Sequence, residues 1–136
     1  MRKAMTWTLI GAAALIGTAA IGQAGGQVLD RDLKLMDQWL GDKQAGPPVS
    51  CIPQRQIRST HYVGDRTILY KVSNTLVYRN DPAGGCPGLN SSAAQITRTP
   101  TGQLCRGDIA HVRDFGLGFS SGSCALSEFV PYRRVR

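Results

Sequence analysis

Two histidines and the aspartates near them are the residues of this chain best suited to acid–base or metal chemistry. His111 lies between Asp108 and Asp114, and a histidine beside a carboxylate is a common general acid–base arrangement. His61 lies in a predicted strand and could face His111 across a sheet. The spacing of these residues matches no metal-ligand motif. A small hydrolase or metal-dependent enzyme using His111 with Asp108 or Asp114 is therefore kept as an alternative, while we expect no catalytic, cofactor-binding or metal residue.

A second chemical motif is Gly118-Phe119-Ser120-Ser121-Gly122, which has the Gly-x-Ser-x-Gly spacing of a nucleophile elbow. In such an elbow the serine occupies a sharp strand-to-helix turn, and the acid and the histidine follow it in the chain. Here both histidines precede the serine, and a predicted strand follows it. We therefore predict that residues 116–122 form a flexible loop without a nucleophile.

The four cysteines are widely separated, at Cys51, Cys86, Cys105 and Cys124. The sequence has neither the Cys-x-x-Cys pair of a redox site nor paired zinc-binding spacing. Widely spaced cysteines in a short exported chain predict two structural disulfides. Three connectivities are possible. Because a terminal strand commonly pairs with the first strand of a small barrel, the one we favour joins Cys51 to Cys124 and Cys86 to Cys105.

The N-terminal residues predict an export signal. Arg2 and Lys3 precede an uncharged run over residues 4–22, and small residues follow it. We place the cleavage after Ala24, with Ala20 as the alternative, so that residues 1–24 are the signal peptide. An uncleaved anchor is a further alternative, but the run is mostly Ala, Gly and Thr, which insert weakly. We expect a periplasmic or secreted product with no stable membrane insertion after cleavage.

The chain is basic, with 16 Lys and Arg against 9 Asp and Glu and a net charge of +7 at pH 7. This surplus suits weak association with an anionic envelope component, and an unknown envelope protein is the other candidate partner. Nucleic acid is not an expected partner, because aromatic and basic positions are not interleaved and the compartment is wrong. We expect a monomer without a cofactor.

The elements that position these residues are one helix followed by short strands. Residues 25–47 are predicted to hold an amphipathic helix that Gly41 ends, and then a stiff linker containing Gly46-Pro47-Pro48. The apolar stripe of the helix consists of Leu29, Leu33, Met36 and Leu40, widened by Leu35 and Trp39.

The disulfide-linked domain is predicted to span residues 48–136. Residues 56–63, 67–72 and 75–79 alternate or are β-branched and aromatic, which predicts a three-stranded meander. Further short strands are expected at 95–99, 103–105, 109–112 and 125–130. This spacing of strands and turns predicts a mainly β fold, a small antiparallel barrel or sandwich of about six short strands.

Several short segments carry a resemblance to a known family. They are 51–60 (CIPQRQIRST), 65–70 (DRTILY), 86–89 (CPGL), 104–108 (LCRGD), 122–124 (GSC) and 129–132 (FVPY). Through them the chain resembles short exported proteins of alphaproteobacteria and related bacteria that share a small four-cysteine domain of unknown function. The resemblance covers about residues 48–132. It implies a bacterial envelope protein, and it supplies no activity and no catalytic residue.

The leading hypothesis is therefore a non-enzymatic exported domain that binds a partner or ligand in the envelope. Its candidate binding face consists of exposed aromatic and basic side chains such as Tyr62, Tyr70, Tyr78 and Arg79. Packing in the core would explain some of these tyrosines equally well. An inhibitor of a lytic enzyme or protease is an alternative within the same class. Its contacts would be the loops at residues 80–85 and 116–122.

Overall fold

The computed structural model describes residues 30–136, so the predicted signal peptide and Leu29 lie outside the described residues. Within this range no helix is long and apolar enough to cross a membrane. The described chain contains one α-helix, α1 (Asp30–Leu40), a short 3-10 helix, η1 (Gln54–Gln56), and ten strands. The strands are β1 (Lys43–Ala45), β2 (Cys51–Pro53), β3 (Ser59–Val63), β4 (Thr67–Lys71), β5 (Leu76–Asn80), β6 (Ala93–Thr97), β7 (Gln103–Cys105), β8 (Ile109–Asp114), β9 (Ser120–Ala125) and β10 (Phe129–Arg134).

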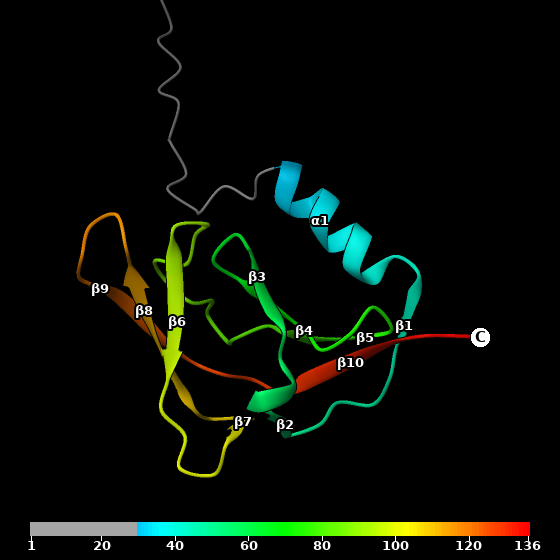
Figure 1. The fold of residues 1–136 in the computed structure, drawn as a ribbon. Helices are drawn as coiled ribbons and strands as arrows, with labels where there is room; N and C mark the ends of the chain where they lie inside the picture. Colours follow the sequence, from blue (N-terminus) through cyan, green and yellow to red (C-terminus); the bar gives the residue numbers. More distant parts are fainter. Residues whose placement is uncertain (1–29) are drawn as a thin grey trace, which may run out of the picture.

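The strands form three antiparallel sheets, which confirms the mainly β fold (Figure 1). The five-stranded sheet has the order β1-β10-β5-β4-β3, the three-stranded sheet has the order β6-β8-β9, and β2 pairs with β7. Among residues 30–136 the edge strands β3 and β6 are not paired with each other, so the sheets do not close into a barrel. The arrangement is sandwich-like.

The five-stranded sheet is covered on both faces. Successive side chains of each strand point to opposite sides, so one strand contributes residues to two different contacts. Leu69 and Val77 face α1 and pack with Leu40 of the helix. Ile68 and Tyr70 face the two smaller sheets and join the larger core cluster. The interior strand β4 is therefore buried on both faces, and its residues 68–70 are a continuous apolar run instead of an alternating pattern.

The helix packs on the sheet, but its buried face differs from the predicted stripe. Met36, Trp39 and Leu40 contact the sheet as expected, and the helix ends before Gly41. Leu33 is 46% exposed, and Asp32 is buried in its place. The periodicity of the apolar residues located the helix correctly and misplaced its contact face by part of a turn.

Three segments differ from their predicted structure. The predicted linker contains β1, which pairs with β10 at the edge of the five-stranded sheet. The predicted loop at 116–122 contains the start of β9, and the last strand spans Phe129–Arg134 instead of residues 125–130. These strands were missed because β1 is only three residues long and β9, with the sequence SSGSCA, has low β-propensity.

The structure confirms two disulfides but contradicts the predicted pairing. The bonds join Cys51 to Cys105 and Cys86 to Cys124. The terminal strand does pair with an early strand, but that strand is β1, which precedes Cys51. Cys51 lies on β2, where the register places it directly opposite Cys105 on β7. Both described bonds are consistent with an oxidising compartment.

Candidate functional site

The structure does not bring the two histidines together. His61 lies on β3 of the five-stranded sheet and faces α1, where its ring centroid is 5.8 Å from that of Trp39. His111 lies on β8 of the three-stranded sheet. Along β8 the buried residues alternate with exposed ones, so His111 points outward with Ile109 while Asp114 points inward. The enzyme alternative required His61 to face His111 across one sheet, and the two residues lie in different sheets.

The two aspartates considered as partners of His111 hold backbone amides instead. Asp108 Oδ2 accepts a hydrogen bond of 2.8 Å from the backbone N–H of Cys105, which forms the disulfide with Cys51. Asp114 Oδ1 accepts hydrogen bonds from the N–H groups of Gly116 and Leu117. Among residues 30–136, no group of three or more His, Cys, Asp or Glu side chains is placed to hold a metal ion. What these carboxylates do in the structure is shape two turns.

The Gly-x-Ser-x-Gly segment is not a nucleophile elbow, because Ser120 begins β9 and, within the part of the chain that the structure describes, no helix follows it. Both glycines have packing or conformational roles. Gly118 has φ of +75°, which favours glycine in the turn before β9. A Cβ on Gly122 would overlap the carbonyl oxygen of Pro87, so the loop carrying Cys86 can approach β9 closely only at a glycine.

The predicted face of tyrosines and arginine is divided between the core and the opposite side of the sheet. Tyr70 is only 2% exposed, and Tyr62 and Tyr78 pack against the same core cluster. Arg79 occupies the other face of β5 and forms an ion pair of 2.8 Å with Asp81. These residues do not form one exposed binding surface.

Three of the four most exposed large apolar side chains among residues 30–136 lie instead on the turn between β8 and β9. Phe115, Leu117 and Phe119 are 70%, 63% and 58% exposed. In Figure 1 this turn is the orange loop beside β9, on the side of the molecule away from the C-terminus. We call these three residues the hairpin tip. Large exposed apolar side chains that gather at one place mark interaction sites.

Hydrogen bonds to Asp114 brace the backbone of the hairpin tip. Its carboxylate receives the N–H of Gly116 at 2.8 Å and that of Leu117 at 3.2 Å, and its carbonyl receives the N–H of Gly118 at 2.9 Å. Asn90 Nδ2 approaches the other carboxylate oxygen at 3.5 Å. The tip is therefore presented by a turn whose backbone is bonded to a buried side chain.

The sequence contained a signal for this tip that its glycines and serines obscured. Three large apolar residues alternate with glycines at positions 115–119. A core strand would bury such residues, and a solvated loop would seldom carry three of them. Large apolar residues within a predicted loop are therefore the sequence feature from which this surface could have been predicted.

We predict that Asp114→Ala loosens the hairpin tip. Loss of the carboxylate leaves two turn amides without their acceptor, which costs about 1–3 kcal/mol. Amide hydrogen exchange should therefore accelerate at Gly116 and Leu117. Asp114→Asn is the matched control, because its side-chain oxygen still accepts these hydrogen bonds, and it should retain most of the protection. Equal exchange in the two variants would contradict the bracing role.

His61 gives the helix–sheet contact a pH dependence. Burial beside α1 lowers the pKa of His61 below its ordinary value of 6.5, the nearby Asp32 carboxylate opposes this shift, and Arg31 adds to it. Nε2 of His61 is 3.7 Å from Asp32 Oδ1 and has no hydrogen-bond partner within residues 30–136. Burial therefore outweighs the carboxylate, and the neutral imidazole fits the folded state better than the imidazolium.

We predict that the domain loses stability on mild acidification. Above pH 6.5 His61 is neutral in both the folded and the unfolded chain, so its contribution is constant. Below pH 6.5 the unfolded chain takes up the proton first, and stability falls until the pH passes the lowered pKa of the folded state. Thermal midpoints measured across this range should decline less in His61→Gln. A midpoint that rises on acidification in the wild type but not in the variant would contradict the prediction.

Comparisons of the chain with protein-family models, with curated proteins and with solved structures find no match.

Proposed function

We propose that this chain is an exported, non-enzymatic binding protein that inserts its hairpin tip into an apolar cleft on a protein of the bacterial envelope. The observation that carries the proposal is the exposure of Phe115, Leu117 and Phe119 on one braced turn. The predicted signal peptide and the two disulfides support a periplasmic or secreted location. The resemblance to short exported bacterial proteins agrees with it.

A protein cleft is the partner that best fits the geometry of the tip. A narrow turn carries only three apolar side chains, too few for a flat interface of ordinary size. Two of them are aromatic, and interface energy is concentrated in aromatic anchors that fill pockets. Because the turn is already bonded to Asp114, little conformational entropy is lost when it binds. An inhibitor that enters the cleft of a lytic enzyme or protease belongs to this class.

The hydrolase alternative has less support. His111 is exposed on the outer face of β8, whereas Asp108 and Asp114 are engaged by backbone amides. We therefore propose no reaction for His111.

Photo-crosslinking in the native host tests the proposal directly. A photoreactive amino acid at Leu117 should crosslink to a discrete envelope protein, whereas the same residue at Thr101, in an exposed loop between β6 and β7, should not. The triple substitution Phe115→Ser, Leu117→Ser and Phe119→Ser should weaken binding to the captured protein at least about 100-fold. Its thermal midpoint should stay close to that of the wild type, because the replaced side chains are exposed.

Two outcomes would contradict the proposal. Identical crosslinks from positions 117 and 101 would show that the hairpin tip has no specific partner. Binding of the wild type, but not of the triple variant, to phospholipid vesicles without protein would assign the tip to a membrane surface instead.

A further inference from the structure

A polar pocket of about 270 Å³ lies where the five-stranded and three-stranded sheets fail to join. The edge strands β3 and β6 approach each other there, and side chains bridge the gap between them in place of a backbone ladder. Its polar lining includes Thr60, Tyr62, Tyr70, Gln95 and Thr97.

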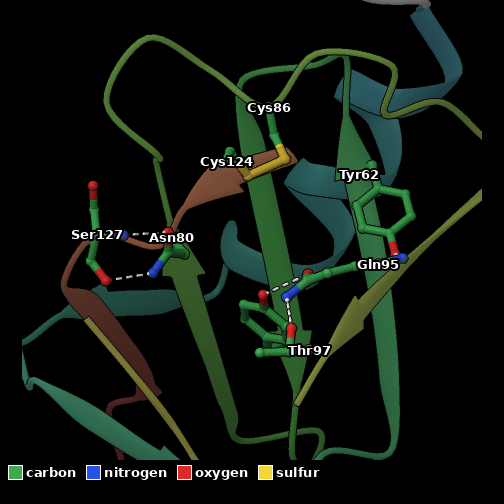
Figure 2. The surroundings of a disulfide bond; sticks show 8 residues. Tyr62, Asn80, Cys86, Gln95, Thr97, Cys124 and Ser127 are labelled. Carbon is green, nitrogen blue, oxygen red and sulfur yellow. Dashed lines mark hydrogen bonds between the residues drawn. A yellow bond between two sulfur atoms is a disulfide. The ribbon is translucent and has the colours of Figure 1, made fainter. Parts of the chain in front are cut away.

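A network of side-chain hydrogen bonds fixes one wall of the pocket. The backbone N–H of Gln95 donates to the hydroxyl of Tyr62 at 3.0 Å, and the Tyr70 hydroxyl donates to Gln95 Oε1 at 2.7 Å. Gln95 Nε2 in turn donates to Thr97 Oγ1 at 3.0 Å. Figure 2 shows Tyr62, Gln95 and Thr97 converging on this seam. The geometry is set by the protein before any ligand binds.

The network leaves several groups free to bind a ligand. The Tyr62 hydroxyl accepts the Gln95 amide, so its own hydrogen remains available, and the Thr97 hydroxyl likewise accepts one bond and can still donate. Thr60 lies on the same face of the sheet as Tyr62 and has no side-chain hydrogen bond within residues 30–136. The pocket thus offers hydroxyl groups at several positions around one small volume.

The lining contains no acidic, basic or histidine side chain, so nothing in it would balance a charged ligand. Burial raises the pKa of both Tyr62 and Tyr70, and their hydroxyls stay protonated at physiological pH. The volume is below the roughly 300–1,000 Å³ of pockets for drug-sized ligands. Ile57 and Leu104 add an apolar wall against which C–H groups can pack.

We infer that this pocket binds a neutral polyhydroxylated ligand of about one sugar ring. Hydroxyl groups both donate and accept, which matches tyrosine, threonine and glutamine side chains, and the C–H face of a sugar ring suits the apolar wall. The pocket involves none of the hairpin tip residues, so this inference is independent of the proposed function.

Amide NMR titration of the full mature chain with glucose, galactose and N-acetylglucosamine tests the inference, with glucuronate as the charged comparison. At least one neutral sugar should shift the amides of Tyr62, Gln95 and Thr97 saturably, and more strongly than glucuronate does. Thr60→Val and Tyr62→Phe should each weaken that binding about tenfold, because a ligand hydroxyl loses its partner. Tyr78→Phe is the matched control and should bind like the wild type, since Tyr78 lies on the neighbouring strand outside the pocket.

The variants also guard against loss of the fold. Thr60 is exposed and makes no side-chain hydrogen bond to the described residues, so Thr60→Val should retain the wild-type amide spectrum. Saturable shifts that Thr60→Val weakens and Tyr78→Phe leaves unchanged would support the site. The inference fails if no neutral sugar shifts these amides, if glucuronate binds more tightly, or if Tyr78→Phe weakens binding as much as Thr60→Val.

Discussion

Replacing Cys86 and Cys124 together by alanine should lower the free energy of unfolding by about 4–5 kcal/mol. The bond joins residues 38 apart in sequence, and its loss frees that loop in the unfolded chain, a change of about 4 kcal/mol by the chain-entropy estimate. The two cysteines are also 0% and 8% exposed within the larger core cluster, so their removal adds a loss of packing. A domain of this size has about 5–15 kcal/mol to lose.

The Cys51–Cys105 disulfide provides the matched control for this replacement. Cys51 and Cys105 are 54 residues apart, so the chain-entropy estimate for their bond is again about 4 kcal/mol. Cys51 is exposed, however, and its replacement removes little core packing. Urea denaturation should therefore rank the Cys86/Cys124 double variant as the less stable of the two, and the variant lacking all four cysteines should not fold at physiological temperature. The reverse ranking would show that packing around the Cys86–Cys124 bond contributes little to the free energy of unfolding.

The fold class could be predicted from the sequence because local residue patterns indicate each strand of the meander. Strands β3, β4 and β5 have β-branched and aromatic residues separated by short turns, and the structure places them close to their predicted positions. The pairing of cysteines depended on contacts between residues far apart in sequence. Which strand lies opposite Cys51 is a property of the assembled sheets, and no local pattern near Cys51 indicates it.

The candidate site was harder to predict for a related physical reason. Tyr70 and Tyr78 were expected to be exposed, but the two smaller sheets cover that face of the five-stranded sheet. Residues 116–122 were expected to form a flexible loop, named only as one contact of the inhibitor alternative, because the small residues of β9 have low β-propensity. Burial and exposure of individual side chains were therefore decided by sheet packing, which the sequence specified only in outline.

Asn80 is the buried polar residue whose replacement should cost the most. It is fully buried at the end of β5, where its Nδ2 donates to the carbonyl of Ser127 at 2.7 Å and its Oδ1 accepts the Ser127 N–H at 3.1 Å (Figure 2). A second, longer bond of 3.4 Å runs from Nδ2 to the carbonyl of Glu128. The side chain thus holds the connection between β9 and β10 as a strand partner would.

We predict that Asn80→Ala lowers the free energy of unfolding by about 3 kcal/mol, because the backbone groups of Ser127 lose their partners. Asn80→Asp has nearly the same shape but should cost about 3–5 kcal/mol at neutral pH, since it sets a buried carboxylate against two carbonyl oxygens. Those oxygens and burial should raise the pKa of the introduced carboxyl above its unfolded value of about 4. The stability of the Asn80→Asp variant relative to the wild type should therefore be greatest below pH 4. It should decline as the pH rises through the raised folded-state pKa of the carboxyl. Urea denaturation at several pH values would test this. The loss of unfolding free energy in Asn80→Ala should be independent of pH. The same pH independence in Asn80→Asp would show that the carbonyl oxygens do not face the side chain.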